Sequence, residues 1–346
     1  YLSGGDKIMN STQASATIFG FQFQINAAIY LMLKYFSDFD QMKIEGSQED
    51  IELFMHNNKK IYAQAKSKEF PTKDNKGHSE KLRDALRTLS NVEDKGNYDL
   101  MYISNLEENP LNSGTKEFDG ISFLKYDELR EESKKKIDSQ ISNGNYNIDT
   151  SKLIIAKIPF YGNDWEQRHK EISKKMAEFV SNISPSLSSF ANRIIIIWEE
   201  EFLHNASIKN PKITINKENI VWGLVVCKLQ LDDVKKFDEK LEIEQTDFLE
   251  AIDEYEKIID IKSSTFLDYN KIISLYSQYK LKKGKPVSIY EFIQDAESEI
   301  FNLIFPDKNK DDIVLRACTK IIAKEIILRS KSIEEIKRGV ENYGNK

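Results

Sequence analysis

Hydrophobic residues in the first 105 positions change their spacing from helical to strand-like and back, which restricts this region to few architectures. Residues 12–36 carry one apolar stripe at helical spacing, made of Phe21, Ile25, Ala28, Ile29, Met32, Leu33 and Phe36. Strand-like runs follow at residues 42–45, 51–55 and 60–65, and a helix at 79–89 and a buried strand at 100–104 come next. This order predicts an α/β sandwich core.

The middle of the chain continues the α/β pattern after an interruption. Residues 105–149 are polar and broken by glycine and proline, so we expect an insertion with one charged helix at 126–141. Further apolar strands are expected at residues 153–158, 193–198 and 220–229, with an amphipathic helix at 164–183.

From residue 231 onward the patterns are helical. Helices are expected at residues 246–259, 265–279, 288–305, 311–329 and 332–343, with Ser288 and Asp311 at N-cap positions. We therefore expect an α/β domain at 12–205 and a mostly helical regulatory or assembly domain at 206–346. The broad apolar faces at 288–305 and 311–329 either fill the second domain's own core or form an interface.

Composition excludes some classes of protein. Of 346 residues, 40% are hydrophobic and 31% are charged, which suits a packed core and argues against general disorder. No apolar run approaches about 20 residues and no signal peptide opens the chain, so a membrane protein is not expected. Cys227 and Cys318 lie too far apart to suggest a disulfide framework or a metal pair, which fits a reducing cytoplasm.

The charge is distributed unevenly around a net value of −6. Residues 59–87 hold nine Lys or Arg against four Asp or Glu, whereas residues 238–256 hold nine acids against Lys240 alone. Either stretch could be an ordinary solvated face. The basic stretch lies next to the candidate site described below, which favours contact with phosphates. The acidic stretch suits a basic partner or repulsion of DNA.

Motifs for nucleotide hydrolysis, dinucleotide redox chemistry and zinc proteolysis are absent from the sequence, and the four histidines lack metal-ligand spacing. One constellation of polar residues remains, on the strands at 51–55 and 60–65. Alternation places Asp50 and Glu52 on one face of the first strand, and Gln64 and Lys66 on one face of the second. The turn-rich link at 56–59 suits a hairpin that brings the two strands together. A carboxylate, an amide oxygen and an ammonium group can thus converge, as metal-assisted phosphodiester hydrolysis requires.

Asp50, followed by Gln64-Ala-Lys66 and preceded by a helix carrying Gly20-Phe-Gln-Phe-Gln24, resembles the PD-(D/E)xK nuclease superfamily. More narrowly, residues 12–105 resemble the endonuclease domain of bacterial anti-phage effectors of the CBASS and Lamassu systems, with the Lamassu nuclease subunit the better match. The resemblance implies a mixed sheet flanked by helices and cleavage of double-stranded DNA with Mg²⁺ (or Mn²⁺). It also implies Asp50 as the central metal ligand, Gln64 as a second ligand and Lys66 as the cation that orients water.

Two residues depart from the pattern of the superfamily. Gln64 stands where many members have an acid, and Gln24 stands where related nucleases often have a helix glutamate. With Gln24 and Gln64 as expected metal ligands, two neutral amides leave the metal ion short of negative charge. Glu45 is the best candidate for the missing charge, with Glu49 and Glu52 as lesser ones.

The resemblance also implies partners and control. The expected phosphate contacts are Lys68, Lys73, Lys76, Lys81, Arg83 and Arg87. An active homo-oligomer and an operon-encoded partner such as an SMC-type ATPase are expected, because a free nuclease would be toxic. Two other interpretations stay open: a catalytically degenerate nuclease fold that serves as a DNA-binding or scaffold subunit, and a structural adaptor.

Overall fold

The structure is a computed structural model, and it describes residues 11–69, 75–105, 117–229, 236–261, 265–284 and 286–344. The chain divides into two compact units, each of which is discontinuous in sequence. The sheet unit comprises the residues up to Phe179 together with Trp198–Asn216, and the helical unit comprises Val180–Ile197 and the residues from Lys217 onward. This division replaces the single boundary expected at residue 205.

The sheet unit is built on a mixed sheet with seven strands among the described residues, in the order β5-β6-β4-β3-β2-β1-β7. The strands are β1 (Phe39–Ile44), β2 (Ile51–Met55), β3 (Lys60–Lys66), β4 (Tyr98–Ser104), β5 (Ser122–Lys125), β6 (Leu153–Lys157) and β7 (Ile215–Asn216). β1, β2 and β3 pair antiparallel, whereas β3, β4 and β6 run parallel. The expected hairpin between β2 and β3 is confirmed, and Asn58 takes a left-handed conformation in its turn.

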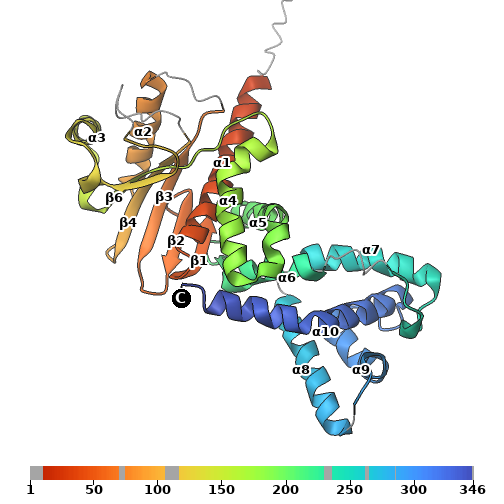
Figure 1. Cartoon of the computed structure of the whole chain (residues 1–346). Helices are drawn as coiled ribbons and strands as arrows, with labels where there is room; N and C mark the ends of the chain where they lie inside the picture. The colour runs from red at the N-terminus through yellow and green to blue at the C-terminus, as the bar shows by residue number, and fades with distance from the viewer. Residues whose placement is uncertain are drawn as a thin grey trace, which may run out of the picture. The chain divides into compact units, whose positions relative to one another are not determined.

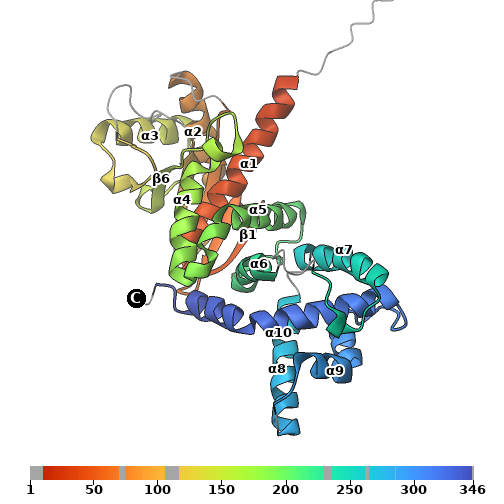
Figure 2. The same ribbon diagram turned by 45° about the vertical axis from the view of Figure 1, so that its right-hand side comes forward.

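Helices cover both faces of this sheet. α2 (Asn75–Leu89) and α3 (Glu131–Gly144) lie on one side, and α1 (Ser11–Lys34) and α4 (Trp165–Ile183) lie on the other (Figures 1 and 2). Each face of the sheet packs against its own pair of helices, and β3 contributes side chains to both faces because they alternate along the strand. Tyr62 packs with α2 and α3, while Ala63 points to the opposite face. A mixed sheet flanked by helices, as expected, is therefore confirmed.

α1 is rich in apolar residues. Ala14–Lys34 is long and apolar enough to span a membrane, which differs from the expectation that no apolar run approaches that length. However, 67% of its most apolar stretch is buried inside the protein. α1 packs against β1, β2 and β3 on one side and against α4 on the other, which accounts for an apolar surface that is wider than one stripe.

Two strand predictions are wrong. Residues 193–198 lie in α5 (Ala191–Ser207) and residues 220–229 lie in α6 (Lys217–Leu229). A short continuous apolar run does not distinguish a buried helix from a buried strand. In α6 almost every residue from Ile220 to Leu229 is buried, so no periodicity marks the helix.

Smaller differences concern the insertion and the element ends. β5 lies in the segment expected to be an insertion and pairs antiparallel with β6, while β7 pairs with β1. The charged helix expected at 126–141 is a 3-10 turn at Tyr126–Glu128 followed by α3. The short edge strands β5 and β7 carry too few residues for an alternating pattern to be recognised.

The helical unit confirms the expected helical C-terminal region. After α6 come α7 (Gln245–Ile261), α8 (Thr265–Lys283), α9 (Ile289–Ile304) and α10 (Ile313–Glu341), and α10 contacts the other four (Figure 2). The two last expected helices form this single α10, whose N-cap is Asp312 and not Asp311. Ser288 caps α9 as expected.

The apolar faces of α9 and α10 are buried within the helical unit. The buried residues are Phe292, Ile293, Ile300, Phe301 and Ile304 on α9, and Ala317, Ile321, Ile322 and Ile326 on α10. Of the two alternatives for these faces, filling the domain's own core is the one that the structure supports.

Candidate active site

The β2–β3 hairpin brings Asp50 and Gln64 into direct contact. Ile51 pairs with Ala63, so Asp50 and Gln64 occupy the next opposed position at the end of the ladder. The Gln64 Nε2 atom donates a hydrogen bond to Asp50 Oδ2, and the same oxygen accepts the Ala65 N–H at 3.1 Å. The convergence predicted from strand alternation is thus present for these two side chains.

Gln64 is held from its other side by α2. The Thr88 hydroxyl lies 2.7 Å from Gln64 Oε1 and 3.0 Å from the Ala85 carbonyl oxygen. The amide oxygen of Gln64 therefore faces Thr88, and its nitrogen faces Asp50. In this arrangement the amide oxygen of Gln64, which is the atom expected to bind a metal ion together with Asp50, accepts from Thr88.

Gln24 on α1 connects the two best acidic candidates. Its Nε2 atom donates to Glu45 Oε1 at 2.7 Å and to the Asp50 carbonyl oxygen at 3.1 Å. Glu45 has a φ of 50°, a left-handed conformation that is uncommon outside glycine and often found at functional sites. Gln24 acts here as a donor to Glu45, whereas the sequence pointed to it as a metal ligand.

Glu52 has a structural role in the turn between β1 and β2. Its Oε1 atom accepts the N–H groups of Gln48 at 2.7 Å and Glu49 at 3.4 Å. A Cβ atom at Gly46 would lie 2.3 Å from Glu52 Cδ, so this position accommodates only glycine without rearrangement. Glu52 therefore stabilises the turn and is not available to bind a metal ion.

Burial dominates the electrostatics of the site. Loss of solvation raises the pKa of Asp50 to about 6, against the opposing effects of Lys66 and the Ala65 N–H. Burial and the neighbouring Asp50 raise the pKa of Glu49 to about 8, again opposed by Lys66. Acids with raised pKa values, gathered beside one lysine, are typical of functional sites.

The raised pKa values make the stability of the metal-free protein depend on pH. Both acids release their protons at higher pH in the folded state than in the unfolded state, where their pKa values lie near 4. The folded state therefore binds more protons between about pH 4 and pH 8, and the free energy of unfolding should fall as the pH rises through this window. Each pKa unit is worth about 1.4 kcal/mol. Urea unfolding at pH 5 and pH 8.5 in a chelator checks this.

Two controls accompany that measurement. Hydrogen bonds from Lys60 and Tyr62 lower the pKa of Asp94 to about 2, so the effect of Asp94 on the free energy of unfolding falls below about pH 4. Asp50→Asn and Glu49→Gln should each flatten the pH dependence. An unchanged slope in both variants would contradict the assignment.

A group of lysines adjoins the acids. Burial, followed by repulsion from Lys66 and Lys68, lowers the pKa of Lys81 on α2, so the three ammonium groups lie near one another. Asn105 is fully buried and makes two hydrogen bonds with the main chain of Lys68. Its amide nitrogen donates to the Lys68 carbonyl oxygen at 2.8 Å, and its amide oxygen accepts the Lys68 N–H at 2.9 Å. The chain after Lys66 is thereby fixed at the end of β4.

The remaining basic candidates differ in their surroundings. Arg83 and Arg87 are exposed on α2, and Arg87 lies 3.6 Å from Asp84. Lys73 and the side chain of Lys76 lie outside the described residues. The structure thus places Lys68, Lys81, Arg83 and Arg87 on or next to α2.

The donor set is compatible with a divalent cation but is not assembled around one. Within the described residues, no three side chains of His, Cys, Asp and Glu converge closely enough to hold a metal ion. Mg²⁺ is usually bound by only one or two carboxylates, together with water and substrate phosphates. Asp50 and Glu45, whose carboxylates are charged neighbours, supply such a pair of hard oxygen ligands.

Thr88 and Asn105 are site residues that sequence reasoning missed. Thr88 lies one position before the buried Leu89 on α2, and Asn105 directly follows a buried strand. Neither position carries a motif, because each contact joins segments far apart in the chain. A polar residue at the end of a buried strand was the single signal that pointed to Asn105.

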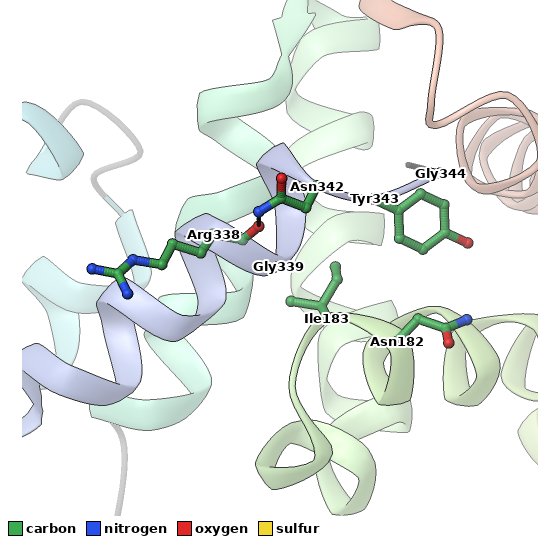
Figure 3. A pocket seen from close by; sticks show the side chains of 7 residues that line it. All are labelled: Asn182, Ile183, Arg338, Gly339, Asn342, Tyr343 and Gly344. Atoms are coloured by element: carbon green, nitrogen blue, oxygen red, sulfur yellow. Dashed lines mark hydrogen bonds between the residues drawn. The ribbon is translucent and has the colours of Figure 1, made fainter. Parts of the chain in front are cut away.

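The helical unit contains a separate cavity of about 430 Å³. It lies between the last turn of α4 and the end of α10 and is lined by Asn182, Ile183, Arg338, Gly339, Asn342, Tyr343 and Gly344 (Figure 3). The Arg338 guanidinium points away from Tyr343, and the lining includes no acid. This cavity lacks the acid–base groups that the hairpin site has.

The fold and site define a mixed α/β unit with an acid–amide–lysine cluster at the ends of two neighbouring strands. Comparison of the chain with family models, curated proteins and solved structures gives no match.

Proposed function

We propose that this protein is a metal-dependent DNA endonuclease of the PD-(D/E)xK type. The contact that carries the proposal is Asp50 against Gln64 at the end of the hairpin, with Lys66 two residues further on the same face. The order of helix, antiparallel strands and QxK strand supports the same conclusion. The site suits an anionic substrate, because Lys66 lies beside the acids and Lys68 and Lys81 lie near Lys66.

The residues have distinct roles in this proposal. A bound Mg²⁺ or Mn²⁺ would polarise the phosphate and activate water. Asp50 and Glu45 would hold the cation, and Gln64 would contribute its oxygen after its amide group rotates, with Thr88 then accepting from the amide nitrogen. Lys66 would orient the attacking water and stabilise the developing negative charge. Lys68, Lys81, Arg83 and Arg87 would bind phosphates on either side.

The biological role and partners are proposed from the resemblance. A Lamassu-like effector nuclease acts in anti-phage defence, with double-stranded DNA as substrate and an SMC-type ATPase as partner. One metal centre cuts one strand, so a double-strand break favours two copies facing opposite strands. We therefore propose that a monomer is inactive or weak and that clustering of the sheet units activates cleavage.

Plasmid cleavage tests this function. The purified chain, alone or fused to an oligomerising coiled coil, is incubated with supercoiled plasmid and Mg²⁺ or Mn²⁺, and light scattering reports its oligomeric state. We expect nicking or double-strand breaks in the clustered form. A strictly monomeric species that cuts both strands at full rate would contradict control by assembly.

A catalytically degenerate, DNA-binding scaffold is the second candidate. It is favoured by the orientation of Gln24 and Gln64, which both direct an amide nitrogen toward an acid. Salt-sensitive DNA binding without cleavage, in every assembly state and with either metal, would support it. Conversion of an inert wild type into an active enzyme by Gln64→Glu would support it further.

DNA binding should depend on salt and on the basic residues of α2. Arg83→Glu and Arg87→Glu should each weaken binding to all sequences similarly and lower the slope of log affinity against log salt by about one, because phosphate contacts carry no sequence information. Lys282→Glu, at an exposed position of α8 in the helical unit, is the matched control. Mobility-shift titrations at several salt concentrations measure the effect. Unchanged affinity in both variants would place the DNA-binding surface elsewhere.

A further inference from the structure

The segment from Glu45 to Glu52, which links β1 to β2 and includes the start of β2, contains four acids, and three of them have defined partners. Glu45 accepts from Gln24, and Asp50 accepts from Gln64 and Ala65. Glu52 accepts from the backbone of the turn itself. Glu49 is the remaining acid in this turn.

Glu49 is buried without a hydrogen-bond partner of ordinary geometry. Its side chain is almost completely inaccessible, with the residue 5% exposed, and both carboxylate oxygens lack such a partner. A buried carboxyl group of this kind is costly, and it indicates a missing ion, water or ligand. The Ser67 hydroxyl, directly after Lys66, is also buried without a partner.

The surroundings of Glu49 indicate the kind of partner. Among the described residues, Asp50, Lys66 and Glu52 act as charged neighbours of its carboxyl group. Lys66 forms no ion pair with Glu49 among the described residues, so the single nearby cation does not satisfy it. Lys66 acts on both Glu49 and Asp50, and Glu45 is a further charged neighbour of Asp50. These three carboxylates carry two more charges than the one ammonium group, and a divalent cation would balance them.

We propose that Glu49 is a further ligand of the divalent cation held by Asp50 and Glu45. This inference rests on the proposed nuclease function and deepens it. Glu49 supplies the negative charge that the neutral amides of Gln24 and Gln64 do not. Glu52, by contrast, remains bound to the N–H groups of the turn and takes no part. Rotation of the Glu49 side chain toward Asp50 completes the site when the cation binds.

The test measures metal binding by the full chain, independently of cleavage. Mn²⁺ is titrated into wild type, Glu49→Gln, Asp50→Asn and Glu93→Gln, and free Mn²⁺ is followed by electron paramagnetic resonance. Glu93 is an exposed acid whose N–H contacts the same turn at Gln48, so it is the matched control. We expect Glu49→Gln to weaken Mn²⁺ binding by about 10-fold or more, with Glu93→Gln unchanged.

Thermal unfolding gives a second readout. Without metal, Glu49→Gln should be at least as stable as wild type, because it replaces an unpartnered buried acid with a neutral group of similar shape. With Mn²⁺, the rise in Tm seen for wild type should shrink in Glu49→Gln. Glu49→Asp, which keeps the charge on a shorter side chain, should bind Mn²⁺ with intermediate affinity.

The outcomes separate this inference from the proposed function. If wild type binds Mn²⁺, Asp50→Asn loses it and both Glu49 variants bind as wild type does, the role of Glu49 is overturned and the nuclease proposal stands. If wild type binds no Mn²⁺, the metal-dependent function fails and the inference fails with it. If Glu49→Gln is unfolded, Glu49→Asp takes its place in the test. Folded Glu49→Asp that binds Mn²⁺ with wild-type affinity and shows the same Mn²⁺-induced rise in Tm would overturn the role of Glu49 as a ligand.

Discussion

Asp50→Asn is expected to lower DNA cleavage by at least about 1000-fold while leaving the fold intact. The variant keeps the shape of the side chain but removes the charge that would hold the cation. Folding should survive because the asparagine oxygen, in the place of Asp50 Oδ2, can still accept both the Gln64 amide N–H and the Ala65 N–H. Plasmid cleavage under activating conditions, with circular dichroism for the fold, measures both effects.

Lys66→Ala should cause a similar loss of cleavage for a different reason. Lys66 is half-buried at the end of β3, so its removal leaves little cavity. The loss should fall on the chemical step, since other lysines nearby still attract the substrate.

Matched controls separate charge at the site from charge in general. Asp119→Asn and Lys95→Ala change exposed residues of the same unit and should retain wild-type cleavage. Full activity in either Asp50→Asn or Lys66→Ala would remove that residue from the site.

Gly339→Ala should destabilise the helical unit strongly, although alanine usually favours a helix over glycine. A Cβ atom at residue 339 of α10 would lie 2.3 Å from the Ile183 carbonyl oxygen and 2.9 Å from two further backbone atoms of Ile183 (Figure 3). Backbone atoms cannot rotate away, so the helices must separate. Overpacking of this kind costs about 1–3 kcal/mol.

Gly20→Ala provides the opposite outcome with the same chemical change. Gly20 lies in α1, and the nearest atom to its added Cβ would be the Ser67 hydroxyl oxygen at an ordinary 3.8 Å. This variant should gain about 0.5–1 kcal/mol from helix propensity. Thermal and urea unfolding of both variants tests the contrast, and a Gly339→Ala protein as stable as wild type would show that the close approach is absent.

The local pattern of the sequence was enough to predict the hairpin and the pair at its end. Strand alternation places Asp50 opposite Gln64 whenever a short turn joins the two strands, and this requires only neighbouring residues. The Ser288 N-cap was predictable for the same reason, since its hydrogen bond reaches only two residues along the chain. Periodicity likewise predicted a helical C-terminal region.

Contacts between distant segments decided the rest. Residues 193–198 and 220–229 are helical, and a continuous apolar run contains no period that could reveal this. Thr88 holds the Gln64 amide from 24 residues away, and Gln24 holds Glu45 from 21 residues away.

The same distinction applies to the acids of residues 45–52. Their residue types were evident from the sequence, and Glu45, Glu49 and Glu52 were equal in chemistry. The folded chain bonds Glu45 to α1 and Glu52 to the turn, and it buries Glu49 without a partner. Hydrogen-bond satisfaction is a property of the packed structure, because it depends on which donors other segments bring within reach. The sequence alone therefore determined that acids would gather beside Lys66, and only the tertiary structure decided which of them remain available.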